Sequence, residues 1–344
     1  MNKPTSLAII QLDAAPAPLA ERLQRAEAQI VQAAQAGAQL VALPELFNTG
    51  YAYRDENFAL AEDPGGPTAA WMQQISARLG IHLAGSLLLR DGGEIYNALL
   101  LHAPDGRFWR YDKNYPWGWE RAYFRERRAV TIAETALGAI GMMLCWDMAH
   151  ADLWRQYAGR VDLILACSCP PNIPDPTYRF PDGSTVTANQ LGPLFGRLRH
   201  SAPTVFRDTP MQQTAWLGVP FLSSTACGTV STPLPNPVGS FLGVLATAPW
   251  LLRYLAQARN VEVSANLVEA GRILAADGRQ LAGLSRQQGE AFALAEVSMP
   301  AERPQPKKPQ PKPPVSPLTY VVSDYLLTAV SLRTYARGKA KREV

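Results

Sequence analysis

Three side chains of the kinds that catalyse acyl transfer each follow a short, apolar, strand-like run of residues: Glu45, Lys113 and Cys145. Active-site groups of layered α/β proteins emerge at such strand ends. A lysine ammonium beside a thiol favours the nucleophilic thiolate, and a carboxylate can take the thiol proton and return it to a leaving amine. The ammonium and the backbone N–H of Trp146 could hold the negative charge that develops on the substrate. These residues predict cysteine-dependent hydrolysis of an amide or nitrile.

Each of these residues has a plainer interpretation when it is taken alone. A cysteine at the end of an apolar strand is usually a buried small residue, and an isolated Glu45 or Lys113 is usually a surface charge. A catalytic pair of Cys145 with His150 is an alternative, although a five-residue offset on a helix points the two side chains apart. The occurrence of all three segments in one chain favours the acid–amine–thiol set.

The three segments resemble the catalytic segments of the nitrilase, or carbon–nitrogen hydrolase, superfamily, whose triad is Glu-Lys-Cys in the same chain order. Residues 43–51 read LPELFNTGY, residues 111–120 read YDKNYPWGWE, and residues 141–148 read GMMLCWDM. The resemblance covers residues 5–297 with a gap in the middle. It implies an αββα sandwich that packs against a second copy into four layers, a thioester intermediate that water hydrolyses, and no cofactor or metal.

The resemblance also suggests further site residues. Glu120, seven residues after Lys113, corresponds to a second glutamate that orients the other catalytic groups. We expect Tyr51, Trp119 and Trp146 to bind substrate as pocket walls, although plain packing of aromatic side chains would place them equally well.

The substrate is less well defined than the chemistry. Residues 210–213 (PMQQ) and 223–225 (SST) depart from the segments that the family usually carries there. The sequence Cys-Trp-Asp at residues 145–147 lies between the Cys-Tyr-Asp of amidase branches and the Cys-Trp-Glu of nitrilases. An amidase is the leading hypothesis. Nitrile hydrolysis, acyl transfer through the same thioester, and a non-catalytic scaffold that binds partners or membrane through its tail are the alternatives.

The composition excludes some classes of protein. The formal charge of +4 over 344 residues is too small to predict a nucleic-acid surface. The four cysteines have neither the spacing of a disulfide framework nor that of a zinc site, and no export signal is recognisable at the N-terminus. We therefore expect a cytoplasmic protein that acts on a small molecule.

The order of elements predicts one large α/β domain followed by a tail. Strand-like and helical patterns alternate from the N-terminus, and turn signals at 91–93 and 104–106 predict hairpins. We place a hydrolase domain at 1–298, with loop insertions at about 170–210 and 231–260. A proline-rich linker at 299–317 and an amphipathic helix with a basic end at 318–344 follow.

Two segments could contact a second copy of the chain or a membrane surface. The apolar stretch within 238–258 and the helix at 318–344 each suit either a homodimer or higher oligomer, or peripheral attachment to a membrane surface. The uncharged run at 238–252 is shorter than the 20 or so residues that a helix needs to span a bilayer.

Overall fold

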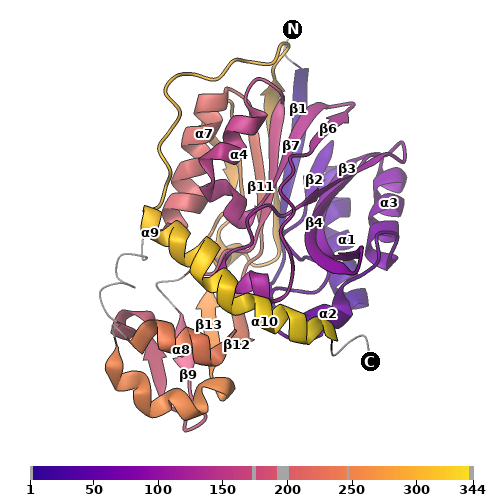
Figure 1. Cartoon of the computed structure of the whole chain (residues 1–344). Coiled ribbons are helices and arrows are strands. Elements are labelled where there is room, and N and C mark those ends of the chain that lie inside the picture. Colours follow the sequence, from indigo (N-terminus) through magenta and orange to yellow (C-terminus); the bar gives the residue numbers. More distant parts are fainter. Residues whose placement is uncertain (1–2, 173–175, 192–200, 246–247, 341–344) are drawn as a thin grey trace.

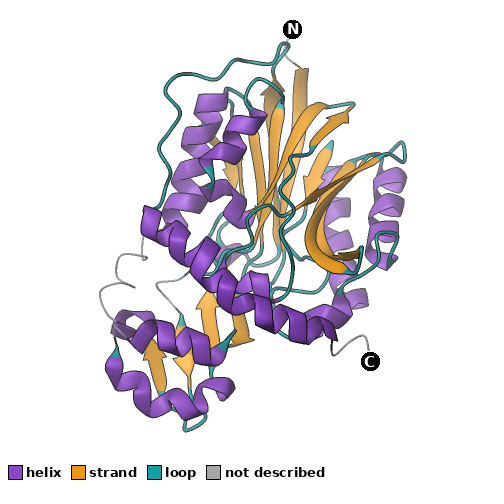
Figure 2. Cartoon of the chain, viewed as in Figure 1, coloured by secondary structure: helices purple, strands orange, loops and turns teal. Residues whose placement is uncertain are grey.

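Two six-stranded sheets lie face to face in the computed structural model, which describes residues 3–172, 176–191, 201–245 and 248–340 (Figures 1 and 2). The first sheet has the order β16-β1-β2-β3-β4-β5, formed by β1 (Lys3–Gln11), β2 (Leu40–Ala42), β3 (His82–Asp91), β4 (Glu94–His102), β5 (Phe108–Asp112) and β16 (Ala291–Met299). The second has the order β15-β14-β11-β8-β7-β6, formed by β6 (Ile132–Thr135), β7 (Gly138–Leu144), β8 (Leu163–Ser168), β11 (Phe221–Thr225), β14 (Arg272–Leu274) and β15 (Gln280–Gly283).

Helices cover the outer face of each sheet. α1 (Leu19–Gln35) and α3 (Pro67–Leu79) pack on the first sheet, where Ile30 and Met72 join one buried cluster with its strands. α4 (Ala151–Tyr157) and α7 (Thr209–Leu217) pack on the second sheet through Trp154 and Leu217. The result is the αββα sandwich that the sequence predicted. Shorter helical segments are α2 (Glu56–Leu60), η1 (Gly118–Ala122), η2 (Cys145–Ala149), η3 (Ala188–Leu191), α6 (Ser201–Pro203), η4 (Thr204–Asp208) and η6 (Arg286–Gln288).

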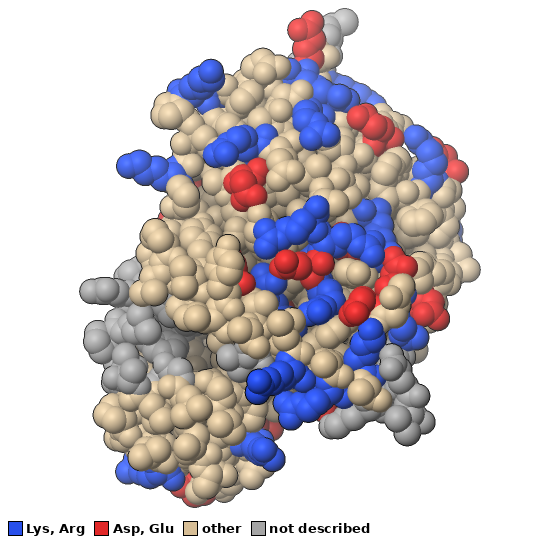
Figure 3. Space-filling view, viewed as in Figure 1, with Lys and Arg blue, Asp and Glu red and all other residues tan. Residues whose placement is uncertain are grey.

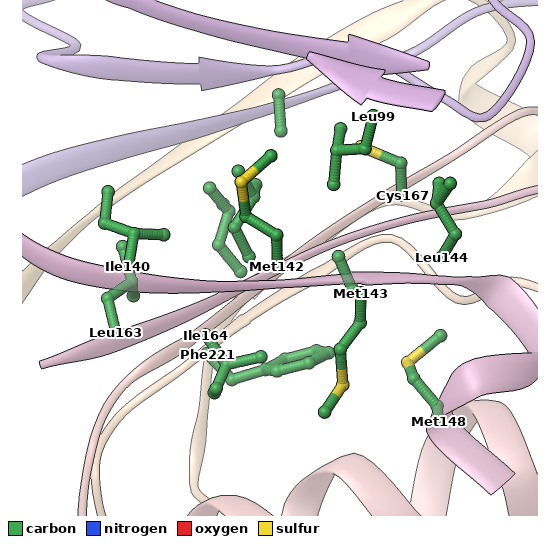
Figure 4. Packing of buried hydrophobic residues seen from close by; sticks show 14 of the residues in the cluster. Leu99, Ile140, Met142, Met143, Leu144, Met148, Leu163, Ile164, Cys167 and Phe221 are labelled. Atoms are coloured by element: carbon green, nitrogen blue, oxygen red, sulfur yellow. The ribbon is translucent and has the colours of Figure 1, made fainter. Parts of the chain in front are cut away.

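Successive side chains of strand β7 fill different layers of the core. Met142 points into the space between the sheets, near Leu99 and Cys167, whereas Met143 points to the other side of the strand, near Phe221 (Figure 4). All of these residues are fully buried. This two-residue alternation explains why β7 is apolar without a break: both of its faces are covered.

Strand directions bring the catalytic candidates to one end of the sandwich. β2 runs parallel to β3, and the β3–β4 and β4–β5 pairs are antiparallel hairpins, so β5 runs in the same direction as β2. Glu45 and Lys113 follow β2 and β5, and Cys145 follows β7 of the facing sheet. The hairpins predicted from the two turn signals are confirmed.

A smaller lobe lies beside the sandwich (Figure 1). Its sheet has the order β10-β9-β13-β12, with β9 (Thr177–Arg179), β10 (Thr185–Thr187), β12 (Thr229–Pro233) and β13 (Glu262–Asn266). α8 (Pro237–Leu245) and η5 (Pro249–Asn260) pack on it, and Phe180, Phe241 and Leu251 share its buried cluster. Part of the uncharged stretch therefore contributes to the core of this lobe, while Leu242, Trp250 and Leu252 are exposed.

The C-terminal tail packs against its own chain. The linker after β16 runs along α7 and α4, where Gln310 Nε2 donates to the carbonyl of Ala151 at 2.7 Å (Figure 1). α9 (Pro317–Tyr320), η7 (Val321–Leu326) and α10 (Leu327–Ala340) follow as one continuous helical segment across the molecule. Among the described helices, none has both the length and the apolar character needed to cross a bilayer. Contact of the tail with a second copy or a membrane stays a prediction.

Charges of both signs are mixed on the face shown in Figure 3, where Lys and Arg alternate with Asp and Glu near the centre. Among the ion pairs of the chain, Arg110 pairs with Asp91 at 2.9 Å, and Arg127 pairs with Asp112 at 2.9 Å. The mixture of signs on this face does not form the unbroken cationic surface that nucleic-acid binding uses.

Candidate active site

The three catalytic candidates meet around one ammonium group. Lys113 Nζ lies 2.8 Å from Glu45 Oε1 and 2.7 Å from Glu120 Oε2. The side chains of all three residues are fully buried. Cys145 lies beside them, since its thiol is among the neighbours that oppose the rise that burial produces in the pKa of the Glu45 carboxyl. The fold thus unites all four residues that the sequence predicted as catalytic.

Glu45 has one occupied oxygen and one available oxygen. Oε1 accepts hydrogen bonds from Lys113 Nζ at 2.8 Å and from Asn97 Nδ2 at 2.7 Å. Oε2 has no conventional hydrogen-bond partner among the described residues. Burial raises the pKa of Glu45, and the neighbouring Lys113 ammonium opposes that rise. A carboxyl whose pKa is raised above its ordinary value is suited to accept a proton and give it back.

Glu120 has no free hydrogen-bonding capacity. Its carboxylate accepts from Lys113, from the Tyr51 hydroxyl at 2.5 Å and from the Trp117 backbone N–H at 2.6 Å. Because the Tyr51 proton goes to Glu120, the Tyr53 hydroxyl donates to Tyr51 at 2.9 Å. Burial disfavours the Lys113 ammonium, but Glu120 and Glu45 outweigh it and raise the pKa of Lys113 well above its ordinary value. Glu120 therefore fixes both the position and the charge of the ammonium.

Backbone turns of unusual conformation present both Glu45 and Cys145. Leu46, directly after the glutamate, has φ 50°, and Cys145 itself has φ 47°. Residues with a Cβ rarely adopt this left-handed region, and such strain gathers at functional sites. Cys145 also begins η2, so the N–H groups of Cys145 and Trp146 lie in its first turn and have no partner within the helix.

Burial and charged neighbours act in opposite directions on the Cys145 thiol. Burial, with a further contribution from Glu45, raises the pKa of the thiol well above its usual value, and Lys113 opposes the rise without cancelling it. Lys113 thus favours the thiolate, as the residue types predicted, but burial outweighs this effect. A nearby carboxylate could take the thiol proton, and the Glu45 carboxyl lies beside it.

Two residues that sequence reasoning missed hold this arrangement together. Asp147 accepts from the Tyr111 hydroxyl at 2.7 Å, the Tyr115 N–H at 2.7 Å and the Leu144 N–H at 2.9 Å. It thereby ties the lysine segment to the turn of the nucleophile, and burial raises its pKa to about 6. The other residue is Asn97, which holds Glu45. A polar residue inside an otherwise apolar strand was the signal that could have revealed Asn97.

The pocket above the thiol is small, with a cavity volume of about 30 Å³. One water needs roughly 10–15 Å³ on this scale, so the cavity as it stands suits a compact acyl group. Its lining comes from Tyr51, Trp117, Glu120, Cys145, Trp146, Pro170, Pro171, Ser201, Ala202 and Phe206.

Two of the predicted wall residues, Tyr51 and Trp146, therefore line the pocket. Trp119 does not. It packs edge-to-face against Tyr53 and against the lining residue Trp117, and so lies behind the pocket wall.

His150 belongs to a different site from Cys145. Its ring stacks on Tyr115 with centroids 3.5 Å apart, and it lines a separate cleft of about 410 Å³ beneath the tail. Burial lowers the pKa of His150 to about 3, so the ring is neutral. The structure does not support the alternative dyad. Within the described residues, no cluster of three or more His, Cys, Asp or Glu side chains could hold a metal ion, and Cys167 and Cys169 are buried free thiols.

Comparison with known proteins agrees with this geometry. Residues 6–189 match the model of the family described as carbon-nitrogen hydrolase. The chain belongs to this family. It is 30% identical to a nitrilase from Pyrococcus abyssi over 138 residues (39% of this chain, 53% of the relative). It is 32% identical to the omega-amidase NIT2 of Xenopus tropicalis over 154 residues (40% of this chain, 54% of the relative). The chain thus spans about half the length of the curated relatives it matches.

Solved structures of the same superfamily share the fold. The protein XC1258 from Xanthomonas campestris, described as a CN-hydrolase superfamily protein, superposes with a TM-score of 0.62 at 19% identity, covering 86% of this chain and 91% of that one. An amidase from Nesterenkonia sp. gives a TM-score of 0.62 at 16% identity, with 86% and 90% covered. At these identities the likeness establishes the αββα architecture.

Proposed function

We propose that this chain hydrolyses the carbon–nitrogen bond of a small amide through a thioester on Cys145. One observation carries the proposal: the buried Lys113 ammonium lies 2.7–2.8 Å from two carboxylates beside a thiol that lines a pocket. A lysine buried with two acids and a cysteine is costly to maintain, because each ion loses several kcal/mol of hydration. Perturbed groups of this kind gather where chemistry occurs.

In the first half-reaction, Glu45 Oε2 takes the thiol proton as the sulfur of Cys145 attacks the amide carbon. The Lys113 ammonium and the Trp146 N–H stabilise the oxyanion of the tetrahedral intermediate. When this intermediate collapses, the carbon–nitrogen bond breaks and Glu45 returns the proton to the leaving nitrogen, which departs as ammonia or an amine. The acyl group remains on Cys145 as a thioester.

In the second half-reaction, Glu45 takes a proton from water as the water oxygen attacks the thioester carbon. The same two donors hold the second oxyanion, and its collapse returns the proton to the sulfur and releases a carboxylic acid. The raised pKa of the Glu45 carboxyl fits both directions of proton transfer. Glu120, with its oxygens fully engaged, positions Lys113 and takes no proton.

Solved neighbours support small amides as the substrate class. A cysteine mutant of the Nesterenkonia amidase has been crystallised with butyramide, and a double mutant with acrylamide. A further mutant of that enzyme shows covalent addition of the acetamide moiety of fluoroacetamide at the active-site cysteine. Substrates of this size suit the narrow pocket above Cys145.

A nitrile is the second candidate substrate, favoured by the match to a nitrilase and by the Cys-Trp pair at the nucleophile. Sulfur would add to the nitrile carbon, and the developing charge would fall on nitrogen within reach of the same donors. Glu45 would return the thiol proton to that nitrogen to give a thioimidate. One water would then displace ammonia and leave the thioester, and a second water would release the acid.

The test compares the wild type with Cys145→Ala in the presence of acetamide, acrylamide, butyramide and the matching nitriles. We expect an acyl adduct by intact-mass spectrometry and continuous ammonia release with at least one amide, both absent in the variant. An adduct that persists after one equivalent of ammonia and is discharged by an added amine would indicate acyl transfer. If neither class gives an adduct, the chain is a non-catalytic scaffold and the proposal is wrong.

Assembly and location are separate proposals. We propose that the chain forms a homodimer, which light scattering on the purified full-length protein measures directly. Flotation with anionic liposomes tests membrane attachment through 238–258 and 318–344. Protein that stays at the bottom of the gradient contradicts it.

A further inference from the structure

The tail reaches the active site at the residue that follows the nucleophile. Trp146 is buried and lines the pocket, and its indole Nε1 donates to Asp324 Oδ1 on η7 at 3.2 Å. The indole ring also lies 6.4 Å, centroid to centroid, from the ring of Tyr320. Tyr320 in turn donates its hydroxyl to the carbonyl of Ala149 at 2.6 Å, in the same short helix as the nucleophile. The tail thus holds both Trp146 and the helical turn that contains it.

A second contact reaches the segment that carries Glu120. Gly118 begins η1 at φ +31°, and a Cβ built there would lie 2.8 Å from Leu327 Cδ1 of the tail. The tail therefore packs directly on the backbone of the turn that presents Glu120 to Lys113.

The far end of the tail is fastened independently. The Tyr335 hydroxyl donates to Glu94 Oε2 at 2.6 Å and accepts from the Ile95 N–H at 2.9 Å. Asn236 of the small lobe donates to Ser331 Oγ at 3.0 Å. These contacts to the sandwich and to the small lobe fix the course of the helix. They therefore also fix the position of Asp324 on it.

We propose that the C-terminal helix supports the active-site pocket of its own chain from behind the lining residue Trp146, and that Asp324 is a positioning residue that acts through Trp146. The inference rests on the proposed function, in which the backbone N–H of Trp146 stabilises the oxyanion. A buried indole N–H needs an acceptor, and Asp324 is the partner that the structure gives it. Without that acceptor the indole loses its fixed orientation, and with it the wall of the pocket and the turn of the nucleophile.

Asp324→Asn and Asp324→Leu separate a positioning role from simple packing. Asparagine keeps an oxygen that can accept from the indole N–H of Trp146, whereas leucine keeps a side chain of similar volume and removes the acceptor. We expect kcat to stay within threefold for Asp324→Asn and to fall about tenfold for Asp324→Leu, since small displacements of catalytic groups have effects of at least this size. Tyr325→Ala, at a side chain that is 71% exposed on the same helix, is the matched control and should keep wild-type kcat.

Alkylation by iodoacetamide gives a readout that does not depend on amide turnover. The sulfur of Cys145 displaces iodide, and peptide mapping compares its rate with those of the buried Cys167 and Cys169. We expect Asp324→Leu to speed alkylation of Cys145 at least threefold while the other two thiols stay protected, which excludes general unfolding. This result would stand even if no amide were hydrolysed.

Three results would overturn the positioning role. They are equal kcat values in Asp324→Leu and wild type, equal losses in Asp324→Leu and Asp324→Asn, or parallel alkylation of all the buried thiols.

Discussion

Replacing Lys113 with methionine tests the electrostatic core of the site. Methionine keeps the unbranched shape and removes the charge that both carboxylates share. At 2.8 and 2.7 Å, each ion pair has a gross attraction of about 6 kcal/mol for an effective dielectric constant of about 20. Part of this lost attraction is offset, because the lysine no longer has to be desolvated and a carboxyl left without its partner can bind a proton. The net loss of unfolding free energy at pH 7 should be about 3–5 kcal/mol, as for other buried pairs that lose one partner.

The pH dependence of that loss has a definite sign. Burial already raises the pKa of Glu45, and removing Lys113 takes away the group that opposes the rise. An acid with a raised pKa in the folded state contributes most stability when protonated and loses it as the pH rises through that pKa. The stability gap between wild type and Lys113→Met should therefore narrow from pH 7 to pH 5.

Guanidinium unfolding followed by tryptophan fluorescence at both pH values measures the gap. Lys312→Met, at an exposed lysine of the linker, is the matched control and should unfold like the wild type. We also expect kcat to fall at least a hundredfold, the usual effect of losing one oxyanion donor. A gap below 1 kcal/mol at pH 7, or one that widens at pH 5, would refute the reasoning.

Three further substitutions test the groups around the triad. Burial raises the pKa of Asp147 to about 6, so the wild type has about 3 kcal/mol of stability below pH 4 that it loses as the pH rises through 6. Asp147→Asn has no carboxyl to titrate and should lack this fall, so the difference between the two proteins in urea midpoints should change by that amount across the range. Asn97→Ala removes a hydrogen bond to the charged form of Glu45, so the acidic limb of the kcat/KM profile should move to higher pH; an unmoved limb would mean that Asn97 does not hold the base. Tyr51→Phe removes one donor to Glu120 and should lower kcat about tenfold with little change in the thermal midpoint, which steady-state kinetics and calorimetry check together.

The sequence by itself predicted the chemistry and determined the order of the elements. Each candidate catalytic residue sits in a short segment whose residue types suffice to recognise it, and the alternation of helical and strand-like periods depends only on local spacing. The hairpins after β3 and β4 followed from their turn residues. Because Glu45 and Lys113 end strands that run in the same direction, their meeting point could be expected before any distance was known.

Tertiary structure decided what depends on contacts between distant parts of the chain. The pKa of the Cys145 thiol follows from its burial, which outweighs the lysine that the residue types placed beside it. Trp119 lies outside the pocket lining and Asp147 joins two catalytic segments, and no local pattern distinguishes these roles. The sequence of the tail predicts a helix and does not say where that helix packs. The complete fold brings Asp324 of the tail to Trp146. Burial and hydrogen-bond partners are properties of the packed chain, so periodicity and residue type do not specify them.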